Sequence, residues 1–195
     1  MSDIPPLVAD CDRALAAVQQ LVDNVPADQW TAPTPCTEWN VRELVQHMAG
    51  GNAIFASVVT RERPAGPITP EERAIDRLGD DPAEGFRAAG RKLHDALCAP
   101  GALEEEFDVP MVGVQPGAMI VHMRINELLV HGWDLARATG QPADLPEDLA
   151  EQALMMWRKR LEGRPRETTP FAAERAVPDG APASDRLAAF LGRQP

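Results

Sequence analysis

The feature that most constrains the fold is a long, uninterrupted helical pattern that runs from Pro116 to Thr139. Proline favours the first turn of a helix, Gly140 is a typical C-terminal stop, and Pro142 prevents the helix from resuming. Alanine and leucine dominate the periodic stretches, whereas aromatic residues make up only 5% and tyrosine is absent. Because this bias suits helices better than strands, we expect an all-α fold.

Apolar residues recur at steps of three and four in several other segments, which is typical of amphipathic helices. These segments are residues 7–25, 40–55, 82–97, 146–163 and 184–192. The charged, Pro- and Gly-rich residues 61–81 predict an exposed connection with a helical turn near 70–78, and Pro110 and Gly113 favour an extended loop over a strand at 107–114. We expect a single domain over residues 1–195, with a bundle core at about 5–160 and a C-terminal extension at about 161–195.

The formal net charge of −11 argues against nucleic acid or an anionic membrane surface as a partner, since both require clustered Lys and Arg. The first residues, MSDIPPLVAD, lack the basic start and apolar run of a signal peptide, and no stretch reaches the length of a membrane span. The three cysteines, Cys11, Cys36 and Cys98, suggest neither a disulfide framework nor a metal knuckle. We therefore expect a cytoplasmic protein that acts on a small molecule as a monomer or homodimer.

A candidate metal site combines two residues of the long helix with one residue of an earlier helix. Glu127 and His131 are four positions apart, so they lie only about 40° apart around the helix axis. A carboxylate and a neutral imidazole both bind zinc, and two histidines with one carboxylate are typical of a catalytic site. His47, on the helix that begins near Asn40, is the third candidate ligand.

Two neighbours of this pair are candidates for supporting or substrate-binding roles. Asp134 follows His131 by three positions and is placed to accept a hydrogen bond from its ring, and Arg124 is placed to pair with a carboxylate. An alternative is that this polar face is exposed to water and binds no metal, so burial decides between the two interpretations.

Other potentially reactive residues have simpler structural explanations. We expect His94 at the surface, His122 pointing away from Glu127, and Cys36 as a structural thiol. The four tryptophans are expected to serve as packing anchors.

The strings CTEWNVRELVQHMAG and NELLVHGWDLARATGQ resemble the metal-binding domain of mycothiol-dependent maleylpyruvate isomerases, in the DinB-like superfamily. The resemblance covers roughly residues 5–160, and the tail DGAPASDRLAAFLGRQP is similar to the ending of an uncharacterised actinobacterial subgroup. It implies a four-helix bundle that binds zinc through His47, Glu127 and His131.

The resemblance also implies metal-centred chemistry on mycothiol, a low-molecular-weight thiol. The isomerases carry a further C-terminal domain, whereas only residues 162–195 follow the last bundle helix expected here. We therefore expect a mycothiol-dependent transferase or isomerase of small electrophiles. The alternative is a non-catalytic bundle with a structural or sensing role, with or without metal.

Overall fold

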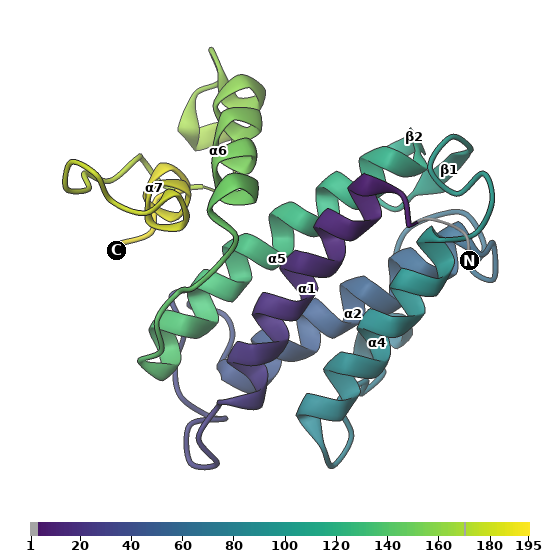
Figure 1. Ribbon diagram of the computed structural model, residues 1–195, viewed down its shortest axis with the longest axis horizontal. Coiled ribbons are helices and arrows are strands. Elements are labelled where there is room, and N and C mark those ends of the chain that lie inside the picture. The colour runs from purple at the N-terminus through teal and green to yellow at the C-terminus, as the bar shows by residue number, and fades with distance from the viewer. Residues whose placement is uncertain (1–3, 170) are drawn as a thin grey trace.

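A computed structural model describes residues 4–169 and 171–195 of the chain. Four long helices form a bundle: α1 (Pro6–Asp23), α2 (Val41–Val59), α4 (Pro82–Leu97) and α5 (Gly117–Thr139). Each of them packs against two of the others, since α1 contacts α4 and α5, and α2 contacts the same two helices (Figure 1). The structure confirms the predicted all-α bundle.

Local sequence signals define the ends of the two helices that carry the candidate site. Helix α2 begins with a capping box, in which Asn40 accepts a hydrogen bond from the Glu43 N–H and the Glu43 side chain accepts one from the Asn40 N–H. Helix α5 ends at Gly140, which has the left-handed conformation (φ 66°) that glycine adopts without strain. The polypeptide around the candidate ligands is therefore regular helix with well-defined starts and stops.

The prediction of an extended loop at 107–114 is wrong, because this segment forms a β-hairpin. Strands β1 (Glu106–Val109) and β2 (Gly113–Pro116) pair in antiparallel register, with Val109 opposite Gly113. Pro110 lies in the turn between the strands and so removes no hydrogen bond from the ladder. Met111 has a positive φ of 67° in the same turn, and β2 leads directly into α5.

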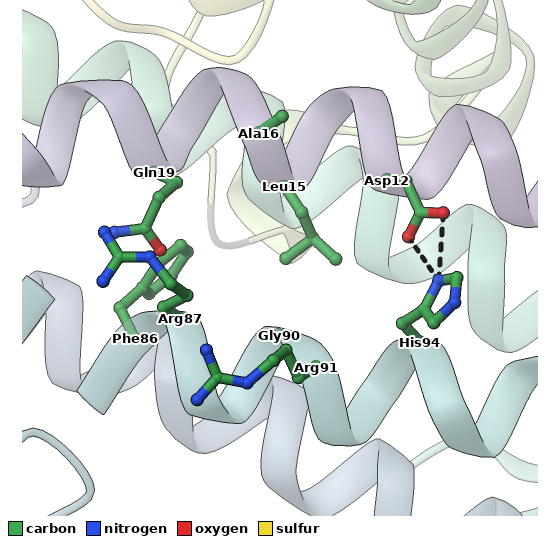
Figure 2. A pocket seen from close by; sticks show the side chains of 9 residues that line it. All are labelled: Asp12, Leu15, Ala16, Gln19, Phe86, Arg87, Gly90, Arg91 and His94. Atoms are coloured by element: carbon green, nitrogen blue, oxygen red, sulfur yellow. Dashed lines mark hydrogen bonds and ion pairs between the residues drawn. The ribbon is translucent and has the colours of Figure 1, made fainter. Parts of the chain in front are cut away.

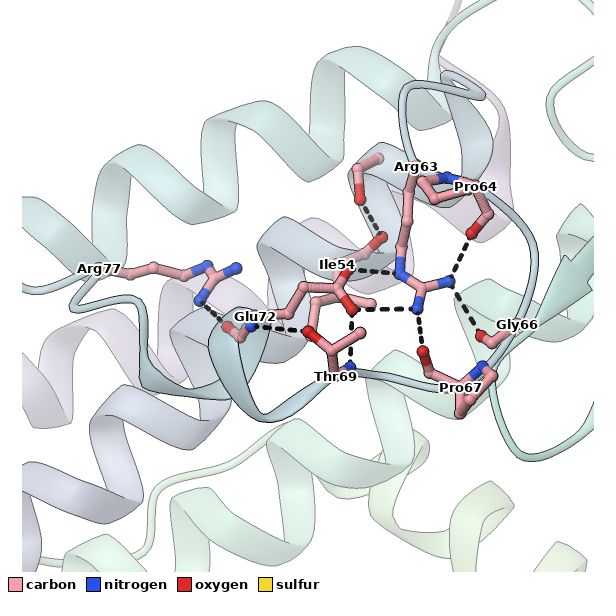
Figure 3. A network of polar contacts seen from close by, with 9 residues as sticks. Ile54, Arg63, Pro64, Gly66, Pro67, Thr69, Glu72 and Arg77 are labelled. Atoms are coloured by element: carbon pink, nitrogen blue, oxygen red, sulfur yellow. Dashed lines mark hydrogen bonds and ion pairs between the residues drawn. The ribbon is translucent and has the colours of Figure 1, made fainter.

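The charged connection between α2 and α4 is organised around Arg63. Its side chain is only 5% exposed and donates hydrogen bonds to the carbonyls of Pro64, Gly66 and Pro67 and to the carboxylate of Glu72 (Figure 3). Glu72 also completes a capping box with Thr69 that starts the short helix α3 (Pro70–Ala74). One arginine therefore supplies donors to three backbone carbonyls of this connection.

The C-terminal extension packs on the outside of the bundle beside α5. It follows α6 (Glu147–Leu161) and contains a short 3₁₀ turn, η1 (Arg166–Thr168), and helix α7 (Ala183–Phe190). Helix α7 lies beside α6 (Figure 1) and contacts both α6 and α5. The Trp133 Nε1–H donates to Asp185 Oδ1 at 2.7 Å. None of the helices within the described residues has the length and hydropathy needed to cross a membrane.

Candidate metal centre

The structure brings His47, Glu127 and His131 together between α2 and α5. One potential ligand atom from each lies within 4.8 Å of the other two, and His47 Nε2 is 3.5 Å from Glu127 Oε1. The two imidazole rings are 5.0 Å apart between centroids and stand almost perpendicular. The structure therefore brings three residues of two helices together, and the four-residue spacing of Glu127 and His131 accounts for the part that lies on α5.

This arrangement fits the requirements of a zinc ion. Ligands of a tetrahedral zinc, with bonds of about 2.0–2.2 Å, lie about 3.3 Å apart, which is close to the separation of His47 and Glu127. The side chains of His47, Glu127 and His131 are 34%, 39% and 13% exposed, so the cluster is open to solvent on one side. A site with three protein ligands and an accessible side has the composition of a catalytic zinc centre.

Glu127 is held in its charged form by its neighbours. Burial alone would raise the pKa of its carboxyl group, but the positive charge of Arg124 and the hydrogen bond with His47 outweigh burial and lower the pKa to about 2. Arg124 is fully buried and forms an ion pair with Glu127 Oε2. Glu127 therefore presents an ionised oxygen to the cluster at neutral pH.

Arg124 is fixed by further contacts with α2. Its Nη2 atom donates to Asn52 Oδ1 at 2.9 Å and to the Met48 carbonyl at 3.2 Å. The guanidinium group lies against Gly51, where a Cβ atom would come within 2.3 Å of Arg124 Nη1. The second of two consecutive glycines in α2 thus provides the space in which the arginine lies.

His131 is oriented by Asp134, one turn further along α5. The His131 Nδ1 atom is 3.1 Å from Asp134 Oδ2, and the Asp134 side chain is fully buried. Burial lowers the pKa of His131 and keeps the ring neutral, although Asp134 acts in the opposite direction. Burial alone would raise the pKa of Asp134, but the Arg193 and His131 hydrogen bonds lower it below its ordinary value.

The loop before α2 covers the other histidine. Trp39 stacks on the His47 ring with 4.3 Å between ring centroids and also meets His131 edge-on. Thr34 braces this loop, because its hydroxyl donates to the Trp39 carbonyl and accepts from the Cys36 N–H. Sequence reasoning treated Trp39 as a packing anchor, and its position over both imidazoles depends on a tertiary contact that no local pattern reveals.

Cys36 also lies closer to the centre than its sequence context suggests. Its sulfur belongs to a second group of potential ligands, with His131 and Asp134, whose atoms lie within 4.8 Å of one another. Burial raises the pKa of the Cys36 thiol, and the charge of Asp134 raises it further, so the thiol form is favoured. The sequence shows no base beside Cys36 because His131 is remote in the chain.

The remaining histidines lie away from this centre. His122 is exposed on α5. His94 is about one-third exposed on α4, and its Nδ1 atom lies 3.0 Å from both carboxylate oxygens of Asp12. This pair closes one end of a groove of about 250 Å³ between α1 and α4, which has Leu15 and Phe86 among its apolar lining residues (Figure 2).

Residues 11–136 match the family described as the mycothiol maleylpyruvate isomerase N-terminal domain. An uncharacterised protein from two strains of Mycobacterium tuberculosis is 38% identical over 189 residues, covering 96% of this chain and 97% of each relative. A second uncharacterised protein from the same species is 29% identical over 157 residues, covering 72% of this chain and 59% of the relative.

Two solved structures share the fold. The crystal structure of a mycothiol-dependent maleylpyruvate isomerase superposes with a TM-score of 0.60 at 19% identity, and that of a mutant of the enzyme with a TM-score of 0.62 at 17% identity. Each alignment covers 82% of this chain and 75% of the other. The family match spans most of the chain and includes His47, Glu127 and His131, so this chain belongs to the mycothiol maleylpyruvate isomerase N-terminal domain family.

Proposed function

We propose that this protein holds a zinc ion with His47, Glu127 and His131 and uses it to transfer or isomerise a small electrophile with the help of a thiol, mycothiol being the first candidate. The observation that carries the proposal is the convergence of the three ligand atoms within 4.8 Å. The mycothiol-dependent enzyme among its structural neighbours supports the choice of thiol.

A zinc ion bound at this centre would lower the pKa of a thiol and so provide a nucleophile near neutral pH. The protein's own residues prepare the site for this chemistry. Glu127 is ionised because of Arg124, and His131 is neutral, so both offer a lone pair without first losing a proton. Trp39 limits the rotation of His47 by stacking on it.

The exposed side of the cluster is where the thiol and its electrophile would meet. His47 and Glu127 retain about one-third of their side-chain surface, so a small molecule approaches without unfolding of the loop before α2. A purely structural zinc site is closed by four protein ligands, whereas three ligands leave one position for a substrate. The solvent exposure therefore favours a catalytic role.

The test is a thiol-conjugation assay on zinc-reconstituted protein. Mycothiol and a chromogenic electrophile such as 1-chloro-2,4-dinitrobenzene are mixed with wild-type protein, the His131→Ala variant and the His122→Ala variant. His122 lies exposed on the same helix and serves as the matched control. We expect zinc-dependent conjugation by wild type and His122→Ala, and loss of conjugation in His131→Ala.

Two other outcomes would contradict the proposal in different ways. Zinc binding without thiol consumption for a panel of electrophiles would indicate a non-catalytic bundle. Conjugation that persists in His131→Ala would place the chemistry elsewhere on the protein.

A further inference from the structure

The buried carboxylate of Asp134 has a second partner that comes from the far end of the chain. Arg193 Nε donates to Asp134 Oδ1 at 2.6 Å and Arg193 Nη2 donates to Asp134 Oδ2 at 2.8 Å. The arginine therefore grips both oxygens in a fork, which is the most directional form of an arginine–carboxylate pair. Asp134 Oδ2 is the same atom that faces His131 Nδ1.

We propose that Arg193, a residue of the C-terminal extension, is a positioning residue of the metal centre: it fixes Asp134, which holds His131 with its Nε2 atom free to bind metal. This inference rests on the proposed metal site. It also extends that site beyond the family domain, which matches only residues 11–136.

The chemistry of the three groups sets the orientation of the imidazole. An ionised carboxylate only accepts hydrogen bonds, so the hydrogen in the contact with Asp134 belongs to His131 Nδ1. A neutral imidazole with hydrogen on Nδ1 carries its lone pair on Nε2. Partners of this kind, behind a ligating histidine, set its tautomer and ring orientation.

Asp134 depends on Arg193 because it has no access to water. Its side chain is fully buried, and an isolated buried carboxylate is costly unless a positive group compensates it. Arg193 is itself only 13% exposed, so the pair is screened weakly by solvent. Without the arginine, the buried carboxylate would turn toward other donors, and this change would release the His131 ring.

Three local contacts in the C-terminal extension place Arg193 beside Asp134. A hydrogen bond from Trp133 to Asp185 links α5 to α7. Trp133 immediately precedes Asp134 on α5. Gly192 then takes a left-handed conformation (φ 89°), and its Cβ position is blocked by Ala172, so only glycine allows this close turn. The Arg193 N–H donates back to the Ala188 carbonyl at 3.0 Å and fixes the exit direction of the chain.

The experiment measures zinc affinity in the full-length protein by competition with a chromogenic chelator. Arg193→Gln removes the charge and the fork but keeps an amide N–H donor group, whereas Arg193→Lys keeps the charge and loses only the fork. We expect Arg193→Gln to weaken zinc binding by about 10- to 100-fold and to alter the visible spectrum of the cobalt-substituted protein, with Arg193→Lys closer to wild type. Arg186→Gln, which removes an ion pair with Glu151 on the surface of the same extension, is the control and should leave zinc affinity unchanged.

A double-mutant cycle separates this role from general loosening of the tail. If Arg193 acts through Asp134, Arg193→Gln costs little additional zinc affinity in an Asp134→Asn background. Wild-type zinc affinity in a folded Arg193→Gln protein, or an equal loss in both backgrounds, would overturn the role of Arg193. Should Arg193→Gln not fold, as judged by circular dichroism, the same comparison is made with Arg193→Met, which also lacks the charge and the fork, and wild-type zinc affinity and cobalt spectrum in that variant would overturn the role of Arg193. A wild-type protein that binds neither zinc nor cobalt would overturn the proposed function as well, so the two failures are distinguishable.

Discussion

Gly51 lies against the guanidinium group of Arg124, and replacing it by alanine tests whether this buried arginine is as tightly held as its contacts imply. The new Cβ atom would lie 2.3 Å from Nη1 and 2.9 Å from Cζ, whereas a comfortable contact is about 3.5 Å. The guanidinium group would therefore have to shift by about 1 Å. It has little freedom to do so, because Arg124 is fully buried and donates to Asn52 and Met48.

The magnitude follows from three contributions. Overpacking costs about 1–3 kcal/mol, and loss of a hydrogen bond to a charged group costs about 1.5–3 kcal/mol. Replacing glycine by alanine inside a helix returns about 1 kcal/mol. The Gly51→Ala variant should therefore be about 1.5–5 kcal/mol less stable than wild type. This corresponds to a Tm lowered by roughly 3–20 °C for a chain of this size.

Gly50 provides the matched control because it is the preceding residue of the same helix. A Cβ atom built on Gly50 meets nothing within 4 Å, so Gly50→Ala should gain about 0.5–1 kcal/mol from helix propensity alone. Urea unfolding of both metal-free variants, followed by far-UV circular dichroism, measures the two changes. Equal shifts for the two variants, or a Gly51→Ala protein at least as stable as wild type, would refute the reasoning.

Two further predictions concern other parts of the centre. The pKa of Glu127 is lowered from 4.5 to about 2 in the folded state, so its charge stabilises metal-free protein above pH 4.5, and this contribution is lost as the pH falls toward 2. The stability difference between wild type and Glu127→Gln should accordingly shrink over that range in urea titrations, and a constant difference would contradict it. Trp133→Phe removes the hydrogen bond to Asp185 and should speed amide hydrogen exchange in α7. The indole N–H of Trp157 has no partner among the described residues, so Trp157→Phe is the control and should leave exchange in α7 nearly unchanged.

The parts of the fold that the sequence predicts are those set by local chemistry. Pro116 and Gly140 define the ends of α5, and Asn40 with Glu43 starts α2, because proline geometry, left-handed glycine and capping hydrogen bonds act within a few residues. The hairpin before α5 escaped prediction because Pro110 argues against a strand, although here it occupies the turn. Proline destabilises a strand because it lacks the N–H that would pair with the neighbouring strand, and this cost does not arise in the turn between two strands.

In the candidate site too, some residues can be placed from local sequence patterns and others only from the tertiary packing. Glu127, His131 and Asp134 share one helix, so periodicity is enough to place them on one face. Cys36, Trp39 and Arg193 approach that face from segments that are distant in the sequence. Their positions depend on how the loop before α2 and the C-terminal extension pack on α5, and no spacing rule within either segment encodes this packing.

The central claim is that His47, Glu127 and His131 bind one divalent metal ion, and metal analysis of purified protein tests it most directly. The protein is reconstituted with zinc, passed through a desalting column and analysed for bound metal beside the His47→Ala, His131→Ala and His122→Ala variants. We predict about one zinc ion per chain in wild type and His122→Ala, and far less in the other two variants. A wild-type protein that retains no zinc after reconstitution, or ligand variants that retain as much as wild type, would contradict the account.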